Sequence, residues 1–469
     1  MRTSDGVYGR VGWLMNVRKA ILEGSMERPS RFLQVAFNQD DSCFSGATED
    51  GFVIYNTDPL ACKLVRRFQP AEEGVMSGAG TGIGYTRMLY RTNYTALVGG
   101  GKRPRYPLNK LVIWEDLQQR ESVVLKFMSP IKQVFLSRVH IIVVLESSVE
   151  VFQFQSTPKR ICPSLEIYPH GTVDFVVSQA RYRRESQGSV GKNRVVHNGV
   201  ANDGSSTNGG VNGIIAFPSA RSVGQVHIAD LSRLKHNDQN PEGTQLLPTS
   251  IIKAHKTPIR FLRLNHQGTM IATCSVQGTL IRLFSTHNGS LIKEFRRGSD
   301  KADIYEMAFS PKGTKLAVVS DKQTLHIFQI SLSKENNGGD EHTRNKTHAL
   351  RKYVPTSWKP RYLDSVWSMC SVHLRNPMLR DNDGDARLQR DRCKIGWCKY
   401  AESESGNDSD EEDSLVLVWR KTGIWEKYVI LEREPQQTSK HIYSAQETLR
   451  NETTSPAQWE LVRESWREL

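Results

Sequence analysis

The amino-acid sequence predicts an all-β protein, on three observations. Short runs rich in Val, Ile, Phe and Tyr recur along the chain and are bounded by Gly, Asp, Asn and Pro, which is typical of strands separated by turns. Long amphipathic helical patterns are nearly absent. A pattern of about 44 residues repeats, which is the period of a WD-type propeller blade.

The repeat is clearest where Phe261–Phe295 is followed by Ile304–Ile330. In both segments a first strand ends at a polar turn, and a second strand ends at a serine, Ser275 or Ser320. A third strand then follows. The segment Phe32–Asp58 is another copy of the same pattern.

Three polar insertions and two tails complete the predicted domain organisation. Residues 181–212, 331–357 and 376–413 are rich in Gly, Asn or charge, and they are expected to be flexible loops. Without them, residues 30–431 leave about 44 residues for each of seven blades. The sequence therefore predicts a seven-bladed β-propeller with long polar loop insertions. Residues 1–29 and 432–469 are predicted to be tails, with room for a short terminal helix in Ala445–Trp466.

Composition limits the class of function. The chain has 63 Lys and Arg against 50 Asp and Glu, and the resulting net charge of +13 favours an anionic partner, either a nucleic acid or a membrane surface. The longest apolar run, Ile141–Leu145, is far below the roughly 20 residues of a membrane-spanning helix, so any membrane contact is expected to be peripheral. The seven scattered cysteines include no CxxC pair, which argues against a disulfide framework or a zinc site and favours a reducing compartment.

Catalytic motifs fail on inspection. Gly78–Gly84 does not match a dinucleotide-binding fingerprint, and the glycines at 99–101 lack the remainder of a P-loop. No Ser, His and Asp grouping has the context of a nucleophile. No catalytic residue, metal or cofactor is therefore predicted, and an enzyme is the least favoured interpretation.

The most informative charges are Arg296 and Arg297, which stand side by side where a strand is expected to end. Neighbouring side chains of a strand point to opposite faces, so the two guanidinium groups are expected to serve two sites, one toward each adjacent blade. Guanidinium suits bidentate phosphate binding, and Gly298 allows backbone or ligand to approach closely. The plainer interpretation of such a pair is a solvated strand end.

The flanking blades place further phosphate donors near strand ends. They are His255, Arg260, Ser275, Thr279 and Arg282 in the preceding blade, and Ser320, Lys322, Thr324 and His326 in the following blade. Each of them, taken singly, is also explained as a structural residue of its blade. Together, two donor clusters beside a divergent arginine pair suit two anionic headgroups.

The segment Phe295–Phe328 closely resembles the PROPPIN family, the β-propellers that bind polyphosphoinositides. The family's Phe/Leu-Arg-Arg-Gly hallmark is present as the four residues from Phe295 to Gly298. Tyr90–Asp116 and Ala254–Thr286 also resemble the family, and Lys352–Ser368 does so more loosely.

The resemblance implies two headgroup sites at the propeller rim, one on each side of the motif, for phosphatidylinositol 3-phosphate and phosphatidylinositol 3,5-bisphosphate. It implies that Arg296 and Arg297 bind these headgroups directly, whereas the flanking donors carry over less securely. It further implies recruitment of lipid-transfer and conjugation proteins of autophagy. The expected location is the cytoplasm, peripheral on preautophagosomal, endosomal and vacuolar membranes. The Gly- and Asn-rich insertion and the long tails suit a plant-like member.

Three loops follow from the same resemblance. The family's membrane-inserting loop of blade six is expected within residues 331–361, where the apolar candidates are Leu350, Tyr353, Val354 and Trp358. The acidic run Glu402–Asp413 is expected to point away from an anionic membrane, as a solvated loop or a partner contact. Gly99–Arg105 is a basic loop of blade two, where partner contacts of the family often fall, or else an ordinary solvated loop.

Two other functions stay open. A WD-repeat scaffold that assembles protein complexes without lipid shares the fold but leaves the arginine pair without a role. A propeller that binds nucleic acid would explain the net charge, yet the chain lacks the interleaved aromatic residues that base stacking uses, so no nucleic-acid partner is expected.

Overall fold

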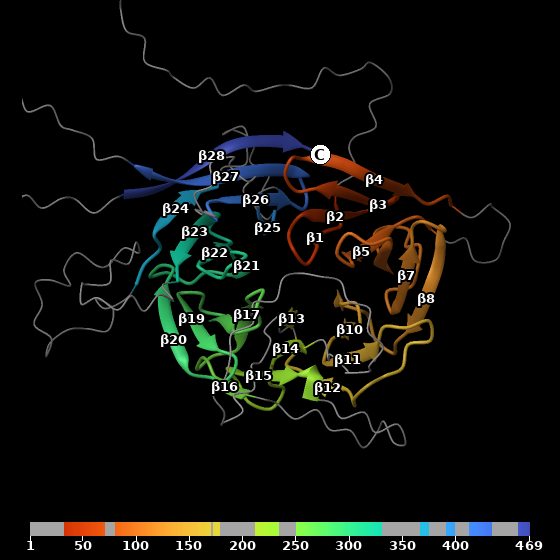
Figure 1. Ribbon diagram of the computed structural model, residues 1–469, viewed down its shortest axis with the longest axis horizontal. Helices are drawn as coiled ribbons and strands as arrows, with labels where there is room; N and C mark the ends of the chain where they lie inside the picture. The colour runs from red at the N-terminus through yellow and green to blue at the C-terminus, as the bar shows by residue number, and fades with distance from the viewer. Residues whose placement is uncertain are drawn as a thin grey trace, which may run out of the picture.

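The computed structural model describes residues 32–70, 80–169, 172–178, 212–233, 250–330, 366–374, 391–398, 412–433 and 458–469. These residues form seven four-stranded antiparallel sheets, arranged as blades around a central axis (Figure 1). The seven-bladed β-propeller predicted from the sequence is thereby confirmed. Among the described residues, no helix has the length and apolar character needed to cross a bilayer.

The strands follow one another blade by blade along the chain. Blades 1 and 2 hold β1 (Gln34–Phe37), β2 (Cys43–Thr48), β3 (Gly51–Asn56), β4 (Ala61–Arg67), β5 (Ile83–Met88), β6 (Tyr94–Gly99), β7 (Lys110–Glu115) and β8 (Arg120–Lys126). Blades 3 and 4 hold β9 (Gln133–Leu136), β10 (His140–Val144), β11 (Ser148–Gln153), β12 (Leu165–Glu166), β13 (Asp174–Ser178), β14 (Asn212–Pro218), β15 (Gln225–Asp230) and β16 (Ser250–Lys253), with the short 3₁₀ turn η1 (Leu231–Arg233) after β15. Blades 5 to 7 hold β17 (Ile259–Leu264), β18 (Met270–Ser275), β19 (Leu280–Ser285), β20 (Leu291–Arg296), β21 (Ile304–Phe309), β22 (Lys315–Ser320), β23 (Thr324–Gln329), β24 (Cys370–His373), β25 (Cys393–Trp397), β26 (Ser414–Trp419), β27 (Ile424–Arg433) and β28 (Gln458–Glu468).

The first strand of each blade lies nearest the axis and the last lies at the rim (Figure 1). Blades stack face to face, so a middle strand is covered on both sides, and all six residues of β18, β22 and β26 are buried. Between blades 5 and 6, Phe261 and Phe295 share one apolar cluster with Phe309 and Phe328. The β-branched and aromatic runs of the sequence form these layers because each run must fill two interfaces.

The ring closes between blades 7 and 1, at the two ends of the described chain. Phe44 of β2 and Trp425 of β27 belong to one buried cluster. The Trp425 indole N–H donates to the Thr57 carbonyl over 3.1 Å, and the Lys427 ammonium lies 3.0 Å from the Asp58 carboxylate. Side-chain packing and a few polar contacts thus hold the closure, without a strand shared between the first and last blades.

The predicted C-terminal tail is wrong over its last residues. Gln458–Glu468 is no helix but β28, the outer strand of blade 7, paired with β27 from Arg433↔Gln458 to Ile424↔Glu468. The pairing shifts by one residue at Lys427, and this bulge places Trp466 in the same cluster as Leu461, although five positions separate them. The bulge breaks the period of two, which is why the segment resembled a helix.

The predicted insertion 376–413 is also wrong in part, because Cys393–Trp397 forms β25, the innermost strand of blade 7. The end of the acidic run is not solvated either. The buried Glu412 carboxylate accepts hydrogen bonds from the Ser310 hydroxyl at 2.5 Å, the Lys312 N–H and the Thr314 hydroxyl. Asp413 forms an ion pair with Lys315 at 2.5 Å. These hydrogen bonds offset the desolvation cost of the buried Glu412 carboxylate, and composition alone does not reveal such partners.

Several expectations fall outside the described residues. These are the tail 1–29, residues 181–211 of the insertion predicted at 181–212, the insertion 331–357, and the loop candidates Leu350, Tyr353, Val354 and Trp358.

Candidate functional site

The donors predicted from the sequence meet at one end of blades 5 and 6. In blade 5 the strand pairing sets Ser275 opposite Ile259 and Arg296 opposite Leu280. In blade 6 Ser320 lies opposite Ile304, as the repeat requires. Strand starts and strand ends therefore alternate along one edge, and the arginine pair leaves β20 at that edge.

Phe295 anchors the motif between the two blades. Its side chain is fully buried, and its ring lies 4.9 Å from the ring of Phe328 in blade 6. The backbone also crosses toward blade 6, because the Arg296 N–H donates to the Val366 carbonyl over 2.8 Å. The aromatic position of the motif thus orients the two arginines that follow it.

Arg297 is buried, with 8% of its surface exposed. Its Nε–H donates to the Gly278 carbonyl over 2.9 Å, and its Nη2–H donates to the Asp300 carbonyl. Its backbone N–H donates to the Thr279 carbonyl over 2.9 Å. Burial lowers the pKa of the guanidinium, against the opposing charges of Asp321 and Asp300. This arginine therefore ties together the loops around it.

Arg296 is the last residue of β20 and is half-buried. Beyond the pair, an added Cβ at Gly298 would meet no atom within 4 Å. No neighbouring atom of the described chain thus requires a glycine there, and the space beside the motif is open for a ligand to approach.

His255 and Arg282 belong to one polar network in blade 5. The His255 Nε2 atom lies 3.0 Å from the Thr273 hydroxyl. Arg282 donates to the Glu294 carboxylate at 2.7 Å and to the Ala254 carbonyl at 2.6 Å. Burial, helped by the charge of Arg282, lowers the pKa of His255 to about 4, so its ring is neutral near neutral pH.

Blade 6 repeats this arrangement with a shorter set of partners. The His326 Nδ1 atom lies 3.2 Å from the Ser368 hydroxyl, and burial together with the charge of Arg297 lowers the pKa of His326 to about 4. Lys322 is exposed at the turn between β22 and β23, where the Thr324 hydroxyl donates to its carbonyl over 3.3 Å. The buried Ser320 hydroxyl accepts the Lys322 N–H over 3.4 Å, as Ser275 accepts the Gln277 N–H in blade 5.

Arg260 of blade 5 is ion-paired with a residue of blade 6. Both carboxylate oxygens of Asp303, which precedes β21, accept hydrogen bonds from its guanidinium. This bidentate bond raises the pKa of Arg260. Sequence reasoning missed Asp303, as it missed Thr273 and Ser368. Thr273 was within reach, because strand pairing sets it opposite Arg282.

The basic loop of blade two is held against blade one. The Arg105 guanidinium lies 5.3 Å from the centre of the Phe68 ring and donates to the Gln69 carbonyl over 3.2 Å. The Lys102 N–H donates to the Glu49 carboxylate over 2.8 Å, whereas the side chains of Lys102 and Arg103 stay exposed.

The chain is similar in sequence to a known family model and to named yeast proteins. The PROPPIN family model matches residues 211–356. The chain is 57% identical to SVP1-like protein 2 of Saccharomyces cerevisiae, over 97% of this chain and all of the relative. It is 50% identical to SVP1-like protein 2 of Candida glabrata, with the same coverage. These relatives are yeast proteins, so they lend no support to a plant-like member.

Solved structures agree with the sequence comparison. Hsv2 of Kluyveromyces lactis superposes with a TM-score of 0.60 at 26% identity, covering 94% of this chain and 99% of that structure. Sequence identity, the matching family model and the shared propeller all lead to one assignment. The chain belongs to the PROPPIN family of phosphoinositide-binding, autophagy-related β-propellers.

Proposed function

We propose that this protein binds phosphatidylinositol 3-phosphate and phosphatidylinositol 3,5-bisphosphate at two rim sites, one on each side of the motif 295–298. Bound to membranes that carry these lipids, it recruits lipid-transfer or conjugation proteins of autophagy. Its location is the cytoplasm, with reversible attachment to preautophagosomal, endosomal and vacuolar membranes. No catalytic step is part of this role.

The observation that carries the proposal is the gathering of donors at one end of blades 5 and 6. Arg296 leaves β20 beside the open space at Gly298, and Lys322 is exposed on the next blade. The hydroxyls and neutral imidazoles around them add uncharged donors, which suit the oxygens of a phosphorylated inositol ring. The guanidinium groups of Arg297 and Arg282 already donate to backbone carbonyls. They therefore contribute positive charge near the ligand rather than direct hydrogen bonds from these N–H groups.

Two weak sites on one rigid rim reinforce one another. Once the first headgroup is bound, the second site meets its ligand at high effective concentration in the same membrane. Each basic residue near an anionic leaflet adds about 1 kcal/mol. Firm binding is therefore expected only where these lipids are concentrated.

The test is flotation of the full chain with phosphatidylcholine vesicles, with and without each phosphoinositide. Arg296→Ala is expected to weaken vesicle binding by about tenfold or more, because it removes a charged donor while keeping the loop contacts of Arg297. Arg67→Ala is the matched control. Arg67 ends β4 opposite Gly51, as Arg296 ends β20 opposite Leu280, and each of the two is adjacent in sequence to a second arginine.

Equal flotation of the Arg296→Ala variant and the wild type would contradict the proposal. If the wild type does not float with the vesicles but still pulls down partner proteins in the absence of lipid, the lipid-independent scaffold would instead be favoured.

A further inference from the structure

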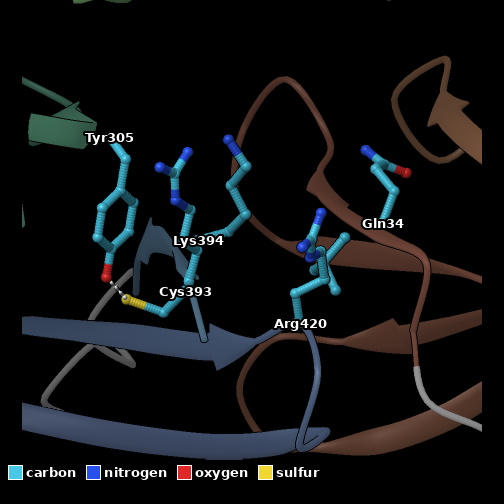
Figure 2. A pocket seen from close by; sticks show the side chains of 7 residues that line it. Gln34, Tyr305, Cys393, Lys394 and Arg420 are labelled. Atoms are coloured by element: carbon cyan, nitrogen blue, oxygen red, sulfur yellow. Dashed lines mark hydrogen bonds between the residues drawn. The ribbon is translucent and has the colours of Figure 1, made fainter. Parts of the chain in front are cut away.

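A pocket of about 200 Å³ lies where blades 6, 7 and 1 meet, and none of its lining residues belongs to the arginine motif. Its lining comes from the innermost strands of three neighbouring blades and from the end of β26. The lining residues are Gln34, Val35, Tyr305, Arg392, Cys393, Lys394 and Arg420. In Figure 2 the charged ends of Lys394 and Arg420 and the amide of Gln34 stand around one open space.

The cations of this pocket share their carboxylates with other cations. Asp303 accepts a hydrogen bond from Arg392 at 2.7 Å, and the same carboxylate is bound by both N–H arms of Arg260. One negative charge thus serves two guanidinium groups. The Arg392 side chain remains half exposed, so part of its donor set faces the pocket.

A second carboxylate is shared between two cations in the next layer toward the interior. Glu306, whose side chain is 2% exposed, is bound by Lys394 and also by Arg263 at 2.6 Å. Arg263 has a second carboxylate neighbour in Asp174, at 3.5 Å. Lys394 therefore also shares its counter-charge.

Arg420 adds a third positive charge to the lining. It is exposed at the end of β26, and no carboxylate among the described residues lies within ion-pair distance of its guanidinium. Asp391 is the nearby acid in the chain, but it directs its carboxylate to the N–H groups of Lys421 and Thr422, at 2.8 and 2.9 Å. Three cations, Arg392, Lys394 and Arg420, therefore line the pocket, and none of its lining residues is an acid.

The neutral polar group of the lining is also a donor. The Gln34 side-chain oxygen accepts the Thr86 N–H over 3.1 Å, which assigns the amide orientation and leaves the NH₂ group for the pocket. The Tyr305 hydroxyl and the Cys393 thiol face one another at 3.7 Å and form part of the wall (Figure 2). The groups directed into the space are thus donors, three of them charged, and their complement is a ligand rich in acceptors.

We propose that this pocket binds a small phosphate-bearing anion. One guanidinium group can donate two hydrogen bonds to two oxygens of a phosphate, and the ammonium of Lys394 adds a point charge. The volume is below the roughly 300–1,000 Å³ of sites for drug-sized ligands, which favours a phosphate or diphosphate group over a nucleotide. The site is separate from the proposed headgroup sites and does not depend on them.

The phosphate group could belong to a free ion or to a headgroup, so the experiment has two arms. The full chain is titrated by calorimetry with inorganic phosphate or diphosphate, and separately with soluble inositol 1,3-bisphosphate, at constant ionic strength. Thermal unfolding is followed in parallel, because a ligand that binds only the native state raises the unfolding temperature. At least one arm is expected to show binding to the wild type.

Two variants locate the site. Arg420→Ala is expected to weaken binding by about tenfold, through loss of one charged donor. Gln34→Glu keeps the acceptor for the Thr86 N–H but replaces the donor with a negative charge, and it is expected to abolish binding. This second variant tests the site independently of the folding of Arg420→Ala. Arg67→Ala, an exposed arginine of blade 1, is expected to bind as the wild type does.

The outcomes are exclusive. Absence of binding in both arms would overturn the proposal. So would binding of free phosphate or diphosphate that survives both Arg420→Ala and Gln34→Glu, or binding in either arm that Arg296→Ala abolishes entirely, because the ligand would then occupy the headgroup sites alone. Binding of free phosphate that Arg296→Ala retains and Gln34→Glu removes would establish a separate site, whatever the result of vesicle flotation.

Discussion

The two arginines of the motif differ in surroundings although they are neighbours in sequence. Arg297 is buried and donates to two loop carbonyls, whereas Arg296 is half-buried at the end of β20. A buried carbonyl that loses its donor is costly, whereas a surface charge that is removed costs little stability. A double substitution would therefore mix a folding effect with a binding effect.

Single substitutions separate the two. Arg297→Ala is expected to lower the free energy of unfolding by about 1–3 kcal/mol, because the Gly278 and Asp300 carbonyls lose their donor. Arg296→Ala is expected to lower it by less than Arg297→Ala does, because the Arg296 side chain is less buried. Urea denaturation of both variants measures the difference, and equal stabilities would refute the structural role of Arg297.

At the scale of elements, β28 shows how an outer strand is recognised by its faces. Leu461 points into the cluster between blades 6 and 7, with 4% of its surface exposed, and its neighbour Val462 is 38% exposed. Arg463 faces inward again and pairs with the buried Glu426 at 2.9 Å. Alternation of this kind belongs to a strand packed on one side.

This alternation gives a matched pair of variants. Leu461→Ala is expected to destabilise the protein by about 2–4 kcal/mol, since it leaves a cavity in a packed cluster. Val462→Ala is expected to cost less than about 1 kcal/mol, because its side chain already meets solvent. Chemical denaturation would show similar small losses for both if residues 458–468 were a tail.

At the scale of the whole molecule, buried ionisable groups make stability depend on pH. Burial lowers the pKa of His140, His255 and His326 to about 4, below the ordinary value of 6.5. The unfolded chain then binds more protons than the folded chain as pH falls below about 6.5. These histidines therefore lower the free energy of unfolding in acid. Burial raises the pKa of Asp41 and Asp174, which acts in the opposite sense.

His140 offers a clean measurement because it lies outside the candidate sites and its Nδ1 atom is buried without a hydrogen-bond partner. Between about pH 7.5 and about pH 5, the wild type is expected to lose about 1–2 kcal/mol more stability than His140→Phe. The free energy of unfolding of both proteins is measured by denaturation at each pH. The aspartates contribute equally to both proteins, so their contribution cancels in the difference. A constant difference between the two proteins would show that His140 is accessible to protons in the folded state.

The fold was predictable because its signals are local. A strand needs only its own alternation and turn residues, and the 44-residue period sets the blades without knowledge of their contacts. The arginine motif, Ser275 and Ser320 were located for the same reason, since their places follow from strand ends. Pairing across one blade also follows from that register.

Contacts between blades were not predictable. Asp303 meets Arg260 and Arg392 only because three inner strands start at the same end of the ring. Glu412 is buried because it reaches the turn between β21 and β22, about 100 residues earlier in the chain.

The sequence by itself determined the class of fold, the number of blades and the end of blades 5 and 6 where the donors gather. The tertiary structure decided that Arg297 holds loops, that Arg260 is ion-paired and that β28 completes the last blade. The physical reason is that strand formation depends on neighbours in sequence. The partner of a buried charge depends instead on which strands the closed ring brings together.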